Sequence, residues 1–259
     1  MFDVKRNLFL CLEYEGTRYQ GWQRQAAGLT VQGEVERALS EVLDQRVSLR
    51  AAGRTDAGVH ALGQAALCFV ETTLPIRAIF HRANRALPDD IVIRNVAEAP
   101  AGFSARGHAV LRHYRYRLIN RRTPPAVDRH TWAHVAMPLD RSLLHRAVAL
   151  YEGQHEFGAF RSSACRAKRT SLTMVQSRLI VEDDRMIFDF ACRSFLHHMV
   201  RILVGTALDV VRGRVGLADV ERLLVGKGDR SQAGRTAPAC GLVLIGIEYA
   251  KPYERFSTL

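Results

Sequence analysis

A short glycine-flanked segment holds a cation and a carboxylate two residues apart. In AGRTDAGVHALGQ (51–63), Arg54 and Asp56 stand between Gly53 and Gly58. Glycine lets the backbone turn tightly and approach a ligand closely, and loops on a rigid scaffold often carry catalytic residues. An ionised aspartate can act as a nucleophile, and a guanidinium binds phosphate or carboxylate oxygens through paired hydrogen bonds. The segment is therefore a candidate active-site loop.

An isolated D-A-G triplet also has a simpler interpretation. A turn aspartate often accepts a hydrogen bond from its own backbone, and Arg54 would then be an exposed ion-pair partner of Asp56. The secondary-structure elements around the loop and the other motifs of the chain are needed to distinguish a catalytic loop from a structural turn.

The first half of the chain predicts the order strand, helix, strand, strand, helix, strand. Apolar residues alternate through NLFLCLEY, and they recur at helical spacing after Thr30, a candidate N-cap. The expected strands are 7–14, 47–51, 64–71 and 90–98, and the expected helices are 31–43 and 76–87. This is the split-βαβ order of ferredoxin-like folds, and it places the loop 53–60 between the second and third strands.

The second half repeats this order loosely. We expect strands at 113–120, 172–182, 185–193 and 241–249, and helices at 140–152, 195–211 and 217–225. The prediction is an α+β protein of two ferredoxin-like (split βαβ, RRM-like) domains, 1–105 and 106–259. Their antiparallel sheets are expected to form a basic central cleft.

The charge of the chain favours a nucleic-acid partner. The formal net charge is +11, and 33 of the 37 cations are arginine. An arginine-biased genome would explain the excess, but the cations also cluster in the stretches 106–129 and 161–169. Aromatic residues interleave with arginine in RHYRYRLINRR, as they do in grooves that bind single-stranded nucleic acid.

Several other classes of protein are disfavoured. The five scattered cysteines include no CxxC pair, which argues against a disulfide framework or a zinc cluster. No stretch has the roughly 20 apolar residues of a membrane span, and the first residues lack the pattern of a signal peptide, so we expect a cytoplasmic protein. His197 and His198 fall in the predicted helix 195–211, where neighbouring side chains point about 100° apart and share an ion poorly. VGKGDRS lacks the spacing of a phosphate-binding loop.

Four segments together resemble the TruA-type tRNA pseudouridine synthases. They are EYEGTRYQGWQRQ (13–25), GRTDAGVH (53–60), RHYRYRL (112–118) and FLHHMVRILVG (195–205). They occur in the family's order and span nearly the whole chain. The resemblance implies isomerisation of uridines 38, 39 and 40 in the tRNA anticodon arm by a homodimer, without metal or cofactor.

The resemblance also implies roles for individual residues. Asp56 corresponds to the catalytic aspartate, Arg54 to the base-flipping arginine, Tyr114 to the stacking tyrosine and Arg201 to the basic partner of the aspartate. The first predicted domain then carries the catalytic loop, and the second carries Tyr114 and Arg201.

Further cations are expected to contact tRNA. Arg106 and Arg122 fall where the family binds its substrate. Pro75 and Ile76 replace a stretch that offers a cation in relatives, and Arg77 is the nearest substitute in this chain.

The implied reaction explains why one loop would hold both charges. Attack by Asp56 at C1′ of the sugar or at C6 of the base requires an ionised carboxylate, and the sequence leaves both sites of attack open. A base inside a stem must first be flipped out, and Arg54 could occupy the vacated space. A non-catalytic RNA-binding module would not need a carboxylate in its basic surface, and a metal-dependent nuclease would need several.

Overall fold

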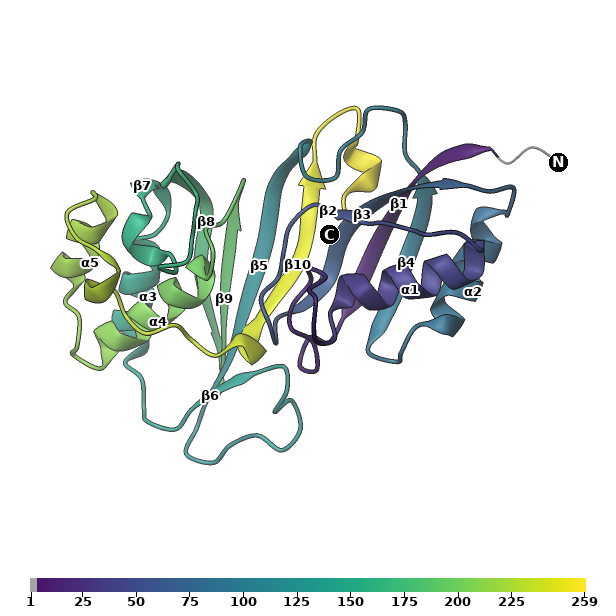
Figure 1. Ribbon diagram of the computed structural model, residues 1–259. Coiled ribbons are helices and arrows are strands. Elements are labelled where there is room, and N and C mark those ends of the chain that lie inside the picture. The colour runs from purple at the N-terminus through teal and green to yellow at the C-terminus, as the bar shows by residue number, and fades with distance from the viewer. Residues whose placement is uncertain (1–3) are drawn as a thin grey trace. The chain divides into compact units, whose positions relative to one another are not determined.

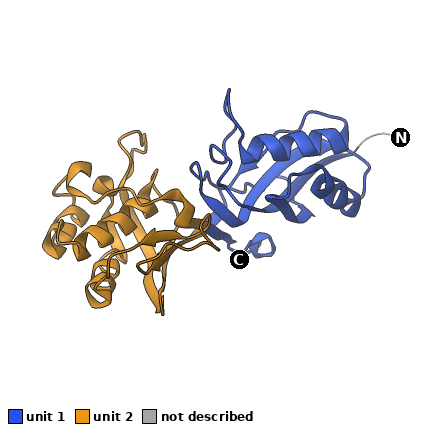
Figure 2. Ribbon diagram, turned by 90° about the horizontal axis from the view of Figure 1, so that it is seen from below, with its two compact units in different colours: residues 1–110, 244–259 blue, residues 111–243 orange. Residues whose placement is uncertain are grey.

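The computed structural model describes residues 4–259, which form ten strands and five α-helices (Figure 1). The chain is a mixed α+β protein with a mixed ten-stranded sheet. It divides into two compact units, coloured separately in Figure 2. Unit 1 comprises the residues up to Val110 together with Leu244–Leu259, and unit 2 comprises Leu111–Val243.

The first six elements of unit 1 occur in the predicted order, and most of β10 (Leu242–Tyr249), which was expected in the second domain, joins them. The elements of this unit are β1 (Lys5–Tyr14), α1 (Val31–Leu43), β2 (Arg50–Ala51), β3 (His60–Glu71), α2 (Ile76–Ala86), β4 (Ile91–Glu98), most of β10 and the 3₁₀ turn η4 (Glu254–Phe256). The strand order is β4-β1-β3-β10, and β2 pairs with β3. β1 pairs antiparallel with both β3 and β4, and α1 packs beside α2.

Local sequence signals account for these elements. Leu8, Leu10 and Leu12 are fully buried along β1, as the alternating pattern predicts for one face, but Phe9 and Cys11 on the other face are buried as well. Thr30 caps α1 by accepting a hydrogen bond from the amide of Gly33 at 3.3 Å, which satisfies one of the free amides of the first turn. The predicted N-cap is confirmed.

The last residues of the chain complete the core of unit 1. The ring of Phe256 lies 5.0 Å from that of Phe9 and 4.7 Å from that of Phe103, measured between centroids. The hydroxyl of Thr258 donates to the carbonyl of Gly63 at 2.7 Å and accepts from the amide of Ile247 at 2.9 Å. The C-terminal segment is therefore packed against the sheet of unit 1 and hydrogen-bonded to it.

Unit 2 has the strand order β5-β9-β8-β7, with β6 paired to β5. Its elements are β5 (Ala109–Asn120), β6 (Ala133–Val135), α3 (Arg141–Ala149), β7 (Gly153–Glu156), η1 (Gly158–Phe160), β8 (Ser171–Glu182), β9 (Arg185–Cys192), α4 (Met199–Val211), α5 (Leu217–Leu224), η2 (Arg230–Gln232) and η3 (Ala239–Gly241). β8 and β9 form the predicted hairpin, which turns at Asp183 with φ 52°.

Several details of the sequence prediction are wrong. The expected strand 47–51 is reduced to the two residues of β2. α4 begins at Met199 instead of residue 195, because the backbone of His198 has φ 63° and cannot continue a helix. β6 pairs with β5 in parallel, so the pairing is not purely antiparallel. The short strands β6 and β7 were not expected.

The division into units follows a different boundary from the predicted domains. It runs through β5 and β10 and returns residues 244–259 to unit 1. The functional domains 1–105 and 106–259 and their ferredoxin-like arrangement stay predictions. Within residues 4–259, no helix has the length and apolar character needed to cross a bilayer.

Candidate active site

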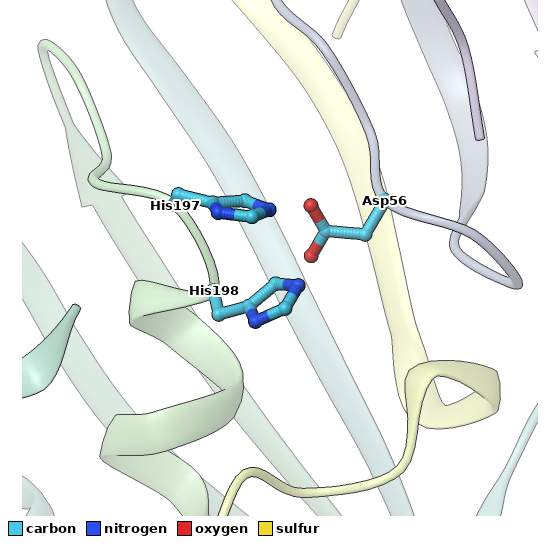
Figure 3. Close-up of side chains that lie close together, drawn as sticks. All are labelled: Asp56, His197 and His198. Atoms are coloured by element: carbon cyan, nitrogen blue, oxygen red, sulfur yellow. The ribbon is translucent and has the colours of Figure 1, made fainter. Parts of the chain in front are cut away.

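The loop between β2 and β3 carries Arg54 and Asp56, as predicted. The side chain of Arg54 is exposed and that of Asp56, labelled in Figure 3, is partly exposed. Thr55, which lies between them, is only 6% exposed. One buried residue thus anchors the loop while its two charged neighbours stay accessible.

A buried hydrogen-bond network holds Thr55. Its hydroxyl lies 2.8 Å from the hydroxyl of Tyr14 on β1. Gln64 on β3 donates to the Tyr14 oxygen at 3.4 Å and to the carbonyl of Gly53 at 3.0 Å. Burial raises the pKa of Tyr14 to about 12, against the opposing effect of its hydrogen bonds to Thr55 and Gln64. The Tyr14 hydroxyl is therefore a neutral, fixed partner for the loop.

The segment after β1 packs directly on the loop. The amide of Trp22 donates to the carbonyl of Thr55 at 3.0 Å, and the amide of Gly58 donates to the carbonyl of Tyr19 at 3.3 Å. These backbone bonds give the segment 13–25 a physical role: it is the support on which the loop rests.

Two glycines make this close packing possible. A Cβ on Gly21, whose φ is 87°, would lie 2.7 Å from the carbonyl oxygen of Thr55. A Cβ on Gly16 would overlap the carbonyl oxygen of Val59. The amide of Gly16 also donates to Nδ1 of His60 at 2.9 Å. Any larger residue at either glycine would push the loop away.

In unit 2, Tyr114 lies on β5 with a side chain only 9% exposed. Its ring contacts Phe195 edge to face, with centroids 5.0 Å apart. Tyr116, two residues further on, is fully buried and donates its hydroxyl to the carbonyl of Pro238 at 2.9 Å. The two tyrosines share one face of the strand, as the alternation predicts.

Arg201 lies in the first turn of α4 and is tied to Ala237 from two sides. Its Nε donates to the carbonyl of Ala237 at 2.8 Å, and the amide of Ala237 donates to the carbonyl of Arg201 at 3.0 Å. Burial raises the pKa of the Cys240 thiol, and the charge of Arg201 opposes that rise. The guanidinium is thus held at a defined place beside η3.

The histidine pair was misjudged from the sequence. Because His197 and His198 precede α4, the argument that helical neighbours point apart does not apply to them. Their ring centroids are 4.0 Å apart, and Figure 3 shows the rings side by side. The carbonyl of His197 accepts from the amide of Ser162 at 2.9 Å, which joins the pair to the basic segment 161–169.

Arg77 is exposed on α2, and the remaining predicted cations, Arg106 and Arg122, lie in exposed turns or loops. Arg106 belongs to a turn closed by the amide of His108, which donates to the carbonyl of Ser104 at 3.1 Å. The His108 ring stacks on Phe103 with centroids 5.6 Å apart. Arg122 lies in the loop that joins β5 to β6.

The comparisons with known proteins identify the family. A family model described as tRNA pseudouridine synthase matches residues 10–106 and 147–250. The tRNA pseudouridine synthase A of Geotalea daltonii is 40% identical over 245 residues, which cover 94% of this chain and all of that protein. The proteins of the same name from Acetivibrio thermocellus and Pelobacter propionicus are 41% and 42% identical over 244 residues, with the same coverage. The chain belongs to the tRNA pseudouridine synthase A family.

As a member of this family, the protein is an isomerase that modifies uridines of the tRNA anticodon stem-loop. The family match includes the loop 53–60, Arg106 and Arg201, whereas Tyr114 and Arg122 lie between its two matched ranges. The resemblance stated from four sequence segments is confirmed.

Proposed function

We propose that Asp56 is the nucleophile with which this synthase isomerises uridines 38, 39 and 40. The observation that carries the proposal is the contrast within the loop: the carboxylate is accessible while the adjacent Thr55 is buried and hydrogen-bonded to Tyr14. A nucleophile must be both reachable and fixed, because catalysis depends on a defined attack geometry.

The reaction balances without a redox partner. The bond between N1 and C1′ breaks, the uracil turns, and a new bond joins C5 to C1′. The proton that leaves C5 and the proton gained at N1 leave the overall composition unchanged, so the reaction consumes no oxidant, reductant or group donor. Attack of Asp56 at C1′ and attack at C6 both fit this balance.

Arg54 is proposed as the base-flipping residue. Its exposed side chain stands two residues before the nucleophile on the same anchored loop. Unstacking a base costs a few kcal/mol, and a guanidinium that enters the vacated space while binding phosphate offsets part of that cost.

Arg201 and Tyr114 are proposed as the partners of the flipped uridine and the nucleophile. A guanidinium within about 4 to 6 Å of Asp56 in the substrate complex would keep the carboxylate ionised beneath the base. The Tyr114 ring offers a surface for stacking on uracil and a hydroxyl that could accept a proton.

The wider proposal concerns tRNA binding and assembly. Arg106 and Arg122 would contact phosphates of the anticodon arm from a basic cleft of two ferredoxin-like domains. The functional form is proposed to be a cytoplasmic homodimer. Sedimentation equilibrium across the working concentration range tests the dimer, and a purely monomeric profile contradicts it.

Tritium release tests the proposed activity. The purified protein is incubated with tRNA that carries tritium at C5 of its uridines, without added metal or nucleotide. Release into water is expected with the wild type and is lost in Asp56→Asn. An RNA-binding module would bind the same tRNA and release nothing, and release by Asp56→Asn would contradict the assigned nucleophile.

A further inference from the structure

We propose that Trp132, Arg185 and Asp128 form a clamp that positions the basic loop, residues 121–131, for tRNA binding. The proposal rests on the proposed contact between Arg122 and tRNA. The basic loop leaves the end of β5, travels away from the sheet and returns to start β6 beside the strand it left. Such a long excursion needs fixed points if its cations are to have fixed positions.

The first fixed point is Trp132, the residue that ends the loop. Its side chain is only 8% exposed. Its amide donates to the carbonyl of Asp128 at 2.9 Å, as does the amide of Thr131. The last turn of the loop is therefore closed by two backbone hydrogen bonds to Asp128, and one of them fixes the backbone of Trp132.

Arg185, at the start of β9, holds two parts of this turn with one guanidinium. Its Cζ lies 4.7 Å from the centroid of the Trp132 ring, within the range of a cation–π contact. Its Nη2 lies 3.0 Å from Oδ2 of Asp128. Arg117 of β5 adds a more distant contact, 6.0 Å from the same ring. The loop is thus attached to two neighbouring strands of unit 2.

Asp128 is the point at which this attachment matters most. Its backbone adopts φ 66°, the left-handed region that residues with a side chain seldom occupy. Aspartate tolerates that region better than most residues. The ion pair with Arg185 holds the strained turn against the sheet.

Two of the three arginines of the basic loop, Arg121 and Arg129, are already engaged within the protein. Arg121 pairs with Asp184 at 3.2 Å, and Arg129 donates to the carbonyl of Ala126 at 3.1 Å. Arg122 is exposed between these tethered points. The clamp therefore presents Arg122 on a loop that is ordered before the substrate arrives, which lowers the entropy cost of binding.

Steady-state kinetics on tRNA test the positioning role. Trp132→Leu removes the ring face, and we expect KM to rise about fivefold with kcat within twofold, as loss of a partly buried cation–π contact predicts. Trp132→Phe retains an aromatic face and should restore most of the affinity. Arg185→Gln removes the exposed guanidinium that contacts both Trp132 and Asp128. It therefore tests the proposal even if a substitution of the buried Trp132 prevents folding. Arg178→Gln, an exposed arginine on β8, is the matched control for lost charge.

Limited trypsin digestion gives a readout without activity. Arg122 and Arg129 lie within the loop, and cleavage there should be severalfold faster in Trp132→Leu and Arg185→Gln than in the wild type or Arg178→Gln. Unchanged cleavage together with unchanged KM in Arg185→Gln overturns the clamp.

The double variant Arg122→Ala/Trp132→Leu separates this inference from the proposed function. If the clamp acts through Arg122, the double variant should have the KM of Arg122→Ala alone. Additive effects of the two substitutions would overturn that route. If Arg122→Ala leaves KM unchanged, the proposed tRNA contact of Arg122 fails, and the positioning role that depends on it is overturned. Faster cleavage of Trp132→Leu and Arg185→Gln would in that case still establish the clamp as a structural device.

Discussion

The hydroxyl of Thr55 and the hydroxyl of Tyr14 lie 2.8 Å apart, although 41 residues separate them in the sequence. Through this bond, the residue next to the proposed nucleophile is fixed to the C-terminal end of β1 in the sheet of unit 1. The loop is therefore more than a flexible connection between strands, and its rigidity can be tested independently of its charges.

Removing the Thr55 hydroxyl should weaken both stability and catalysis. Thr55→Val keeps the shape but leaves the buried Tyr14 oxygen with one hydrogen-bond partner fewer, at a cost of about 1 to 3 kcal/mol in the free energy of unfolding. Single-turnover rates should fall as the loop loosens. Urea unfolding and rapid-quench kinetics measure the two effects. Thr55→Ser, which keeps the hydroxyl, should lie much closer to the wild type; an equal loss in both variants would contradict the assigned bond.

The raised pKa of Tyr14 predicts a loss of stability at alkaline pH. A tyrosine in the unfolded chain ionises near pH 10, whereas burial raises the pKa of Tyr14 to about 12 in the folded protein. The unfolded state therefore loses its proton first, and the contribution is complete below about pH 10 and lost as the pH rises to about 12. The advantage of the wild type over Tyr14→Phe should shrink by about 2 to 3 kcal/mol across this range. Urea unfolding between pH 9 and 12 checks this, and parallel curves would refute it.

A methyl group on Gly21 should disturb the catalytic loop specifically. Gly21→Ala adds a Cβ 2.7 Å from the Thr55 oxygen at a backbone φ of 87°. Gly102→Ala is the matched control, because Gly102 has φ 84° but nothing within 4 Å of its Cβ position. Both variants incur about 1 kcal/mol of left-handed strain, and only Gly21→Ala should also lose kcat. Thermal unfolding and tritium release distinguish the two effects; equal activity in the two variants would show that the clash is relieved without moving the loop.

Neutralising the proposed nucleophile should separate binding from turnover. Asp56→Asn keeps the shape of the side chain but removes its charge, so turnover should vanish. Affinity for tRNA should hold or rise, because a negative charge has left a surface that binds phosphates. Filter binding and single-turnover assays on one preparation measure both. Measurable turnover in the purified variant would contradict the role of Asp56.

Arg54→Ala should discriminate between target uridines. A base paired in the stem costs more to extrude than an unpaired base in the loop, so activity on a stem uridine should fall more steeply. Arg46→Ala, which removes another exposed arginine of unit 1, controls for the change in net charge. Rates on two tRNAs, one with a stem target and one with a loop target, provide the comparison. An equal loss on both would mean that Arg54 does not flip the base.

The elements that the sequence predicted well are those set by local interactions. The start of α1 follows from Thr30, whose capping bond reaches only three residues along the chain. β6 was missed because three residues carry too little pattern, and its place depends on pairing with β5 across the basic loop. The late start of α4 depends on the left-handed backbone of His198, which the apolar spacing of the helix does not reveal.

The candidate site shows the same division. The chemistry of Arg54 and Asp56 could be read from residue types and their glycine-rich surroundings. The interactions that hold these two residues in place could not be predicted, because the Tyr14 network and the backbone bonds of Trp22 join segments far apart in the sequence. The glycines at positions 16 and 21 were the available signal, since glycine often marks close approach of two backbones.

The return of residues 244–259 to unit 1 has a consequence for the protein's biogenesis. A ribosome releases the chain from its N-terminus, and domains generally fold as their sequence emerges. Unit 2 is one continuous stretch, whereas the core of unit 1 needs Phe256 and the hydroxyl of Thr258. Unit 1, which is synthesised first, is therefore expected to complete its fold last. Its sheet stays incomplete until all of unit 2 has been synthesised.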